Sequence, residues 1–306
     1  MIHGILNLWK PPGPTSHDMV SSLRRILHQK RIGHTGTLDP MASGILPICL
    51  GDATRLAEYI TGQHKVYDMT IRFGWTSDTL DRTGQLKKGS TKSVYKNELE
   101  AILKTFIGSI EQVPPMHSAI SLHGTRLYEL ARKGVEIDRP SRTIEIFSIE
   151  PLQELPDIVQ SDTEIRLRVR CSKGTYIRTL SQDIGEKVGC GAVLMDLIRV
   201  ENGVFHQEKA ITMGEVEAAA KIEQIEQILF PIQPADLGLP VYKLNDFEEV
   251  ELNFGRPFFS RYPLENNEIV LCNRDFILAI ASTEELAEGF WMKPKKVLAN
   301  PIKVIS

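Results

Sequence analysis

Eight residues with the sequence GHTGTLDP, at positions 33–40, place one carboxylate in a turn that contains two glycines. The ring of Pro40 crowds the preceding residue and pushes Asp39 out of the helical region toward an extended backbone. Gly33 and Gly36 allow backbone angles closed to other residues and let another molecule come close. An Asp-Pro beside glycines is typical of a plain turn. The same segment can also present one carboxylate in a fixed orientation.

A carboxylate held in this way can act as a nucleophile or as a general base when the site excludes water. An Asp-nucleophile glycosidase needs a second carboxylate, and none stands at an obvious spacing. The four cysteines, at positions 49, 171, 190 and 272, lie far apart, and no Cys/His cluster has zinc spacing. The sequence also has no nucleotide-binding glycine loop and no GxSxG motif. We therefore expect chemistry without a metal or a cofactor, in a chain without disulfides.

Three further motifs accompany this segment in a defined order. They are LWKPPG at 8–13, KVY at 65–67 and CSKGTYIR at 171–178. Together with the longer segment GHTGTLDPMASGILPICLGDATR, they resemble the motifs of the bacterial tRNA pseudouridine-55 synthases, the TruB family. The resemblance runs from about residue 3 to about residue 204, and the chain beyond residue 240 matches only weakly.

The resemblance implies an enzyme that isomerises uridine 55 in the T-loop of tRNA to pseudouridine. That reaction detaches uracil from C1′ of its ribose, rotates the base and rejoins it through C5. Exchange of a C–N bond for a C–C bond is redox-neutral, which agrees with the expected absence of a cofactor. The residues leave open whether the carboxylate attacks C1′, attacks C6 of the ring or abstracts the 2′ proton.

The resemblance also assigns roles to individual residues. Asp39 matches the catalytic carboxylate, and Arg178 matches the arginine that pairs with it. Such a pair would lower the pKa of Asp39 and hold one of its oxygens toward the ribose. Tyr67 matches a tyrosine on the uracil face, and Leu197 matches an apolar residue under the base. His34 matches a histidine that takes up the space of the extruded uridine.

The base of a folded RNA loop must be flipped out to reach such a pocket, at a cost of about a few kcal/mol. Contacts to phosphate could offset that cost. The candidate RNA-binding residues are Tyr176, Lys10, Arg24 and Arg31, with Arg25 and Lys30 beside them. A solvated helix face explains the basic run at 24–31 equally well. Residues 118–142, which carry Arg126, Arg132, Lys133 and Arg139, form either an RNA-gripping insertion or an ordinary surface excursion.

The hydrophobic pattern predicts the elements that position these residues. Residues 164–171 alternate apolar and arginine side chains, which is typical of a half-buried strand. Ser16 can cap a helix over about 17–28, with Asp18 in the first turn, where the helix dipole favours an acid. The pattern predicts further strands over 3–8, 45–50, 65–73 and 193–205, and helices over 53–61, 95–107, 177–188 and 213–229. Residues 76–89 read as a polar loop, and a short helix fits 127–133.

Composition places the chain among ordinary globular proteins of the cytoplasm. Its 306 residues carry a formal net charge of −3. Residues 201–268 hold 13 acids and 5 bases, whereas residues 1–200 hold 22 acids and 26 bases. Because the acids are concentrated in the later segment, residues 1–200 can still form a basic face that binds nucleic acid. The acidic stretch over 201–251 has no explanation beyond a solvated surface. The sequence shows no signal peptide and no apolar run long enough for a membrane span.

We predict an α+β fold, with a mixed, mainly antiparallel sheet flanked by helices. The resemblance gives residues 1–240 the pseudouridine synthase fold and residues 241–306 a small all-β, PUA-like domain with an accessory role in RNA binding. The expected partner is the T-arm of tRNA, with no membrane or metal partner, and the expected state is a monomer. Two alternatives stay open: a pseudouridine synthase with another RNA target, and a tRNA-binding folding chaperone. Asp39, Tyr67 and Arg178 argue against a purely structural role, because binding alone needs no buried acid.

Overall fold

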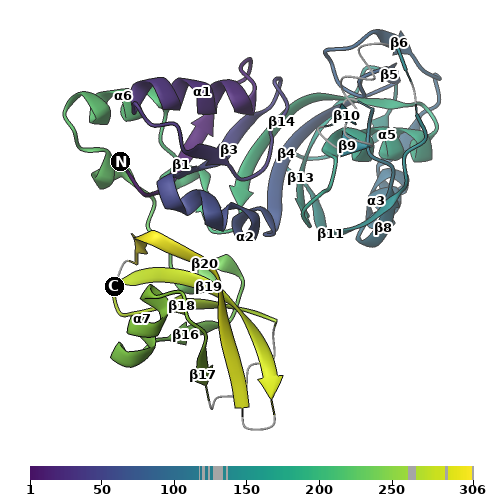
Figure 1. Cartoon of the computed structure of the whole chain (residues 1–306). Helices are drawn as coiled ribbons and strands as arrows, with labels where there is room; N and C mark the ends of the chain where they lie inside the picture. The colour runs from purple at the N-terminus through teal and green to yellow at the C-terminus, as the bar shows by residue number, and fades with distance from the viewer. Residues whose placement is uncertain are drawn as a thin grey trace.

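A computed structural model shows a large mixed sheet flanked by helices and a second, smaller sheet beside it (Figure 1). The structure describes residues 1–116, 118, 121–122, 125–126, 134–135, 137–260, 267–286 and 289–304. The helix predicted over 127–133 lies outside these residues, as do residues 119–120, 123–124 and 136 of the insertion predicted over 118–142. Among the described helices, none has the length and apolar character needed to cross a bilayer.

The large sheet has nine strands, and its main path runs β1-β3-β14-β4-β13-β11-β8. The strands are β1 (Gly4–Lys10), β2 (Ile32–His34), β3 (Ser43–Leu50), β4 (Lys65–Phe73), β8 (Gly108–Gln112), β11 (Arg142–Pro151), β13 (Glu164–Cys171), β14 (Ala192–Asn202) and β15 (Phe205–His206). Of the pairs between these described strands, β14 with β3 is parallel and the others are antiparallel. The predicted mixed, mainly antiparallel sheet is confirmed.

Helices cover the sheet on both faces. They are α1 (Ser16–Ile26), η1 (Gly51–Leu56), α2 (Ala57–Thr61), α3 (Lys96–Lys104), α5 (Ile177–Val188), η2 (Gln207–Lys209), α6 (Met213–Lys221), η3 (Ile225–Ile228) and η4 (Pro234–Leu237). On β3, Leu46 and Ile48 enter the core that α1 and α5 cover, whereas Ile45 and Cys49 enter a second core below α2. Because both faces are covered, this strand reads as a continuous apolar run.

The start of α1 differs from the prediction. Thr15, not Ser16, is the N-cap: its side chain accepts a hydrogen bond from the Asp18 amide, and the Asp18 carboxylate accepts one from the Thr15 amide at 2.8 Å. The prediction that Ser16 caps the helix is therefore wrong by one residue. Ser16 is buried instead, where its hydroxyl accepts from the Leu38 amide at 2.8 Å.

The predicted polar loop at 76–89 contains a short hairpin. Its strands are β5 (Trp75–Ser77) and β6 (Leu86–Lys88), and Lys88 lies over the Trp75 ring with its nitrogen 5.6 Å from the centroid. Two further two-stranded sheets are β7 (Val94–Tyr95) with β12 (Ile158–Val159), and β9 (Ser121–Leu122) with β10 (Thr125–Arg126). Such short strands carry too few residues for a period-2 pattern to separate them from a loop.

The second sheet has five strands in the order β16-β18-β19-β20-β17. They are β16 (Val241–Lys243), β17 (Phe258–Ser260), β18 (Glu268–Cys272), β19 (Phe276–Leu286) and β20 (Gly289–Lys303). The unit is mainly strands, as predicted, but it also contains helix α7 (Asp246–Asn253), which the sequence interpretation missed. Glu248 closes a capping box with Asn245 at the start of α7, and Glu215 does the same at the start of α6. Part of the acidic stretch thus has a structural role at helix starts.

The smaller sheet docks on the segment that follows β3 (Figure 1). The Asp52 carboxylate is buried, forms an ion pair with Arg31 and accepts hydrogen bonds from the backbone and side-chain nitrogens of Asn300 at 2.7 and 2.9 Å. Nearby, Arg55 donates to the Val297 carbonyl at 2.8 Å. The GDATR part of the long motif, at 51–55, is therefore a docking site for β20.

Replacing Asp52 with Asn should destabilise the protein by about 2 kcal/mol at neutral pH, because charge-assisted hydrogen bonds are lost. Burial opposes ionisation, but the bonds from Asn300 and the Arg31 charge together hold the pKa of Asp52 below its ordinary value. An acid whose pKa is lower in the folded state than in the unfolded state stabilises the fold at pH values above its unfolded-state pKa. That stabilisation is lost as the pH falls through the folded-state pKa. The gap between wild type and variant in urea unfolding should therefore shrink below about pH 4. Glu100→Gln, at an exposed acid on α3, is the control.

Candidate active site

Asp39 lies on the loop between β2 and β3, with its side chain 32 % exposed. The carbonyls of this loop accept hydrogen bonds from four residues, two on β14 and two at or just before the start of α1. The bonds run from Asn202 Nδ2 to Thr35 O (3.2 Å), from Arg199 Nη2 to Gly36 O (3.1 Å), from Ser16 Oγ to Leu38 O (3.1 Å) and from the Gly13 amide to Pro40 O (2.7 Å). With its carbonyls held in this way, the loop presents Asp39 in one pose.

Lys10 holds the same loop from inside the protein. Its ammonium is fully buried and donates to the carbonyls of Pro11, Pro40 and Ala42 at 2.9, 3.3 and 2.7 Å. Burial lowers the pKa of Lys10 to about 8, and the Asp39 charge opposes that change. The prediction of a phosphate contact by Lys10 is wrong, because the ammonium points inward and donates its hydrogen bonds to backbone oxygens. Lys10 positions the loop.

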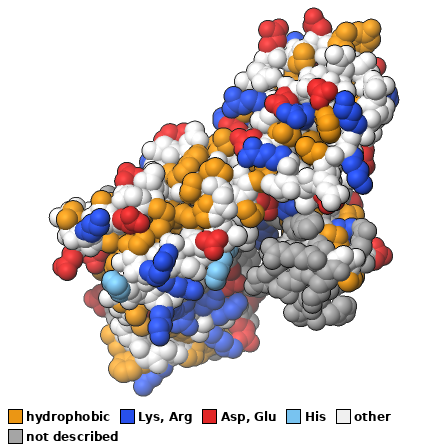
Figure 2. Space-filling model, turned by 90° about the horizontal axis from the view of Figure 1, so that it is seen from above, with side chains coloured by type: hydrophobic (Ala, Val, Ile, Leu, Met, Phe, Trp, Pro, Cys, Tyr) orange, Lys and Arg blue, Asp and Glu red, His pale blue; other side chains and the backbone are white. Residues whose placement is uncertain are grey.

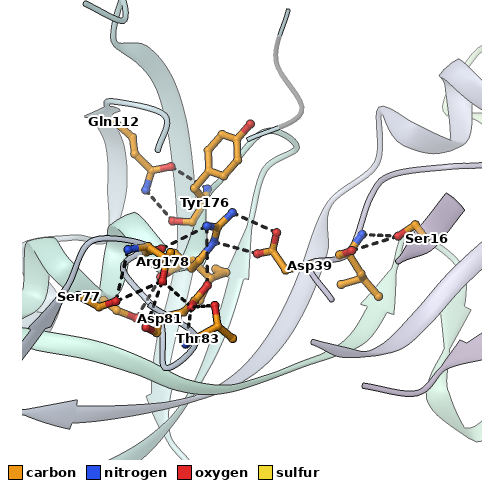
Figure 3. A network of polar contacts seen from close by, with 12 residues as sticks. Ser16, Asp39, Ser77, Asp81, Thr83, Gln112, Tyr176 and Arg178 are labelled. Atoms are coloured by element: carbon orange, nitrogen blue, oxygen red, sulfur yellow. Dashed lines mark hydrogen bonds and ion pairs between the residues drawn. The ribbon is translucent and has the colours of Figure 1, made fainter. Parts of the chain in front are cut away.

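Arg178 grips both oxygens of the Asp39 carboxylate (Figure 3). Its Nε lies 2.9 Å from Oδ2, and its Nη2 donates to Oδ1 at 3.0 Å. Nη1 donates to the Thr79 carbonyl at 3.2 Å and lies 3.8 Å from the Asp81 carboxylate. Arg178 is the second residue of α5, where the helix dipole disfavours a cation. The two carboxylates offset that cost, and the predicted neighbourhood of Asp39 and Arg178 is present.

Asp81 is a member of this network that the sequence interpretation missed. It is buried, and its Oδ1 accepts from the Thr79 hydroxyl at 2.8 Å and from the Thr83 amide and hydroxyl at 2.8 and 2.5 Å. Leu80, which precedes Asp81, has φ 65°, a strained value for a leucine. An isolated β-bridge between Asp81 and Leu194 connects this turn to β14. The available signal is the density of Ser, Thr and Asp at 77–83, a composition that also fits the polar loop predicted there.

The start of α5 is clamped by Gln112 at the end of β8 (Figure 3). Its side-chain amide accepts from the Tyr176 backbone N–H at 2.7 Å and donates to the Tyr176 carbonyl at 3.1 Å. Tyr176 is the N-cap residue of α5, two positions before Arg178. The Arg142 guanidinium lies over the Tyr176 ring, 5.1 Å from its centroid. Gln112 therefore orients both Tyr176 and Arg178.

The pKa of Asp39 is raised above its ordinary value, opposite to the predicted direction. Burial is the main cause, and the neighbouring Asp81 charge adds to it. Arg178 does lower the pKa of Asp39, as predicted, and so does Lys10, but neither outweighs the loss of solvation. The carboxylate is thus costly to ionise, and Arg178 keeps the ionised form accessible.

Tyr67 and Leu197 lie on adjacent strands, β4 and β14, and both side chains are buried. Tyr67 stands opposite Arg199, and Leu197 stands opposite Met69, so all four belong to one face of the sheet. Burial raises the pKa of the Tyr67 hydroxyl, the Arg199 charge opposes this, and Asp39 is close enough to raise it further. Tyr67 and Leu197 share one hydrophobic cluster with Leu38 of the Asp39 loop.

His34 ends β2, directly before the Asp39 loop. Its Nδ1 is buried and has no hydrogen-bond partner in the described part of the chain. Burial, and then the charge of Arg199, lower the pKa of His34. The imidazole is therefore neutral at neutral pH.

The two predicted arginine contacts behave differently. Arg24 is exposed on the last turn of α1, and its Nη2 donates to the Ile32 carbonyl at 3.1 Å. Arg31 is paired with Asp52 through Nη1, and its Nε donates to the Thr54 hydroxyl at 3.1 Å, so two of its nitrogens bind the segment on which β20 docks. Figure 2 shows Lys and Arg side chains gathered on the lower left part of one face.

Metal binding can be tested against the donor set. Within the described residues, no group of three or more His, Cys, Asp or Glu side chains is placed to hold a metal ion. The four cysteines are buried and free of disulfides. The site therefore offers one partly exposed carboxylate, Asp39, an arginine that it shares with the buried Asp81, and an apolar wall with a phenol.

Comparison with known proteins identifies the family. Residues 24–177 match the model of the TruB family pseudouridylate synthase N-terminal domain, and residues 178–239 match that of the tRNA pseudouridylate synthase B C-terminal domain. The chain is 41% identical over 308 residues to tRNA pseudouridine synthase B of Bacillus pumilus, covering 98% of this chain and 99% of that protein. It is 44% identical over 245 residues to the Geobacillus thermodenitrificans protein of the same name, covering 79% of this chain and 81% of that protein.

Solved structures show the same fold. A Cbf5-Nop10-Gar1 complex contains a chain with TM-score 0.73 and 25% identity, with 97% of this chain and 85% of that chain covered. An H/ACA RNP bound to a substrate RNA containing 2′-deoxyuridine contains another, with TM-score 0.73 and 23% identity, covering 97% of this chain and 86% of that chain. With these neighbours and with family models matched from residue 24 to residue 239, the chain belongs to the TruB family of pseudouridylate synthases.

Proposed function

We propose that this protein isomerises uridine 55 in the T-loop of tRNA to pseudouridine, with Asp39 as the essential carboxylate. The observation that carries the proposal is the two-point contact of Arg178 with a partly exposed Asp39 whose pKa is raised. Relatives named tRNA pseudouridine synthase B support tRNA as the substrate. The T-loop position and the base flipping are inferred from the motifs shared with that family.

The reaction needs Asp39 in its ionised form. Breaking the C1′–N1 bond, forming C1′–C5 and moving the C5 proton to N1 conserve electrons, so a single carboxylate can serve the whole cycle. Whether Asp39 acts as nucleophile or as base, it must offer a lone pair. Arg178 occupies one direction on each oxygen and leaves the exposed side of the carboxylate for the substrate. A poorly solvated carboxylate is also a stronger nucleophile and base than one in water.

The uracil is proposed to lie against Tyr67 and Leu197, which share one face of the sheet beside the Asp39 loop. An aromatic ring and an aliphatic side chain hold an extruded base by stacking and burial. Neutral His34 is proposed to fill the place that the uridine leaves, since a neutral imidazole can enter a base stack at little desolvation cost. Tyr176, stacked with Arg142, is proposed to contact the RNA next to the flipped nucleotide.

RNA binding is proposed to use the basic side chains on the face seen in Figure 2, together with exposed Arg24 of α1. Residues 1–240 are proposed to be the catalytic domain, and residues 241–306 to add accessory RNA contacts in a protein that acts as a monomer. Phosphate neutralisation at a few positions supplies affinity without sequence readout. Shape recognition suits a folded RNA arm better than groove reading does.

Asp39→Asn should abolish isomerisation and leave tRNA binding nearly intact, because the change removes the charge and keeps the shape. Turnover should fall below about 1% of wild type, which is about 3 kcal/mol of lost transition-state stabilisation. The measurement is incubation with unmodified tRNA followed by pseudouridine mapping at single-nucleotide resolution, with filter binding in parallel. Turnover above that level in a folded variant would show that another group is the essential carboxylate. Product at a position other than 55 would support the alternative RNA target.

Arg178→Ala should move the acid limb of the pH–rate profile to higher pH. Arg178 lowers the pKa of Asp39, so its loss raises that pKa, and activity should recover partly as the pH rises. Asp81→Asn is the matched comparison, because Asp81 raises the pKa of Asp39 and its removal should move the limb to lower pH. Single-turnover rates from acid to alkaline pH measure both. If the acid limb of the pH–rate profile lies at the wild-type pH in both variants, the proposed effect of Arg178 and Asp81 on the pKa of Asp39 is disproved.

An isolated T-arm hairpin should be a competent substrate, because the candidate contacts form a limited set around the Asp39 loop. Log affinity should fall by roughly 0.9 per phosphate contact against log salt, giving a moderate slope. The measurement compares turnover on full tRNA, the hairpin and a linear RNA of the same loop sequence. Scrambling the stem while keeping its pairing should matter little. Equal rates on hairpin and linear RNA would refute shape recognition, and a silent hairpin would extend the contacts beyond the T-arm.

A further inference from the structure

Arg199 on β14 is a fully buried cation beside the candidate active site. Its Nε donates to the Ile45 carbonyl at 2.7 Å, and its Nη2 donates to the Gly36 carbonyl at 3.1 Å. In the part of the chain that the structure describes, its guanidinium forms no ion pair with a carboxylate. Burying a charge on neutral oxygens alone is expensive, so an apolar side chain would serve stability better. The arginine must supply something other than stability.

The guanidinium joins three elements that carry the site. Ile45 belongs to β3, Gly36 belongs to the Asp39 loop, and Tyr67 stands directly opposite Arg199 on β4. Tyr67 and Arg199 are cross-strand neighbours on one face of the sheet, and the Arg199 charge acts on the Tyr67 hydroxyl by lowering its pKa. A Cβ placed on Gly36 would meet Arg199 Nη1 at 3.7 Å, so the loop passes closely over the arginine. One planar group thus bonds the loop that carries the carboxylate, and its residue stands opposite the phenol on the neighbouring strand.

The charge of Arg199 affects the pKa values of several side chains around the Asp39 loop. The titratable side chains that feel its charge are Lys10 on β1, His34 on β2, and Lys65 and Tyr67 on β4. Lys65 cannot take its place, because the Lys65 ammonium is committed to the carbonyls of Gln63 and Thr61 at 2.7 and 3.1 Å. Of these five side chains, Arg199 is the one that bonds the Asp39 loop and faces Tyr67 together.

We propose that Arg199 is a positioning residue that holds the Gly36 end of the Asp39 loop and the Tyr67 hydroxyl at one fixed separation, so that carboxylate and phenol face the same uridine. The inference rests on the proposed function. The rigid guanidinium plane directs one donor to Ile45 and another to Gly36 while it stands opposite Tyr67, a geometry that the point charge of a lysine ammonium does not reproduce. The charge of Arg199 also opposes the rise in the pKa of Tyr67 that burial causes.

The first test uses Arg199→Lys, which keeps the charge, and Arg199→Met, which keeps the apolar stem. In single-turnover assays with saturating tRNA, the rate should fall on the order of 10²-fold in both, as expected for a small misplacement of reacting groups. tRNA affinity should stay within about threefold. The control is Arg168→Met, because Arg168 is also an arginine of this sheet but binds Asp68 at 2.7 and 2.8 Å on the other face of β13. A folded Arg199→Lys protein with wild-type turnover would overturn the proposal.

A double-mutant cycle with Tyr67→Phe separates positioning from general damage. If Arg199 acts through Tyr67, the combined loss should be smaller than the product of the two single losses. Losses that multiply fully would refute that route. If the wild-type protein makes no pseudouridine in tRNA, the proposed function fails and the mutant cycle has no reaction rate to compare. The spectroscopic test below does not depend on activity and still tests the role of Arg199.

The second test needs no activity. In protein labelled with ¹³C at tyrosine Cζ, the Tyr67 resonance is the one that disappears in Tyr67→Phe. In Arg199→Met the Tyr67 resonance should shift, and its titration should move to higher pH, because a neighbouring cation has been removed. In Arg168→Met it should stay in place. If Arg199→Met does not fold, the same measurement on Arg199→Lys decides through the resonance position. An unchanged Tyr67 signal in the folded variant would overturn the proposal.

Discussion

The ion pair between Asp39 and Arg178 joins two halves of the molecule that the chain keeps far apart. Asp39 stands on the β2–β3 loop beside α1, and Arg178 begins α5 on the other half of the sheet, 139 residues away (Figure 1). Between them run only the central strands β14 and β4 of the sheet path. A carboxylate with a raised pKa and a guanidinium at a helix N-terminus are each unfavourable alone. Their mutual contact makes both tolerable, so the active-site geometry depends on correct closure of the whole sheet.

Much of this arrangement could be predicted from local pattern. Strand β13 follows a strict period of two, and α5 follows its apolar spacing, because each packs one side against the core. The Asp39 segment stood out for its glycines and its proline. Partners that meet across the fold could not be found in this way. Gln112 lies 64 residues from Tyr176, and Arg199 lies 163 residues from Gly36, so no local periodicity connects them.

Lys10 and Asp39 show a second limit, which is physical and not a matter of distance. A lysine before two prolines reads as a surface cation, yet the turn folds its stem inward onto three carbonyls. For Asp39, the family resemblance implies an arginine partner and hence a lowered pKa. The net direction depends on how much water the site excludes, and only the packed structure reveals that burial outweighs the partner. Charge pairing can be read from motifs more easily than desolvation can.

Strand β3 carries the Asp39 loop at one end and the docking segment at 51–55 at the other, about 27 Å apart at ordinary strand rise. Its underside, with Ile45 and Cys49, shares a core with Val270 and Ile280 of the smaller sheet. Cutting the chain near residue 240 would therefore strip one face of the strand that supports the catalytic loop. A truncated protein that loses activity would say little about RNA contacts. The role of the smaller sheet in RNA binding is better examined by changing its outward-facing side chains.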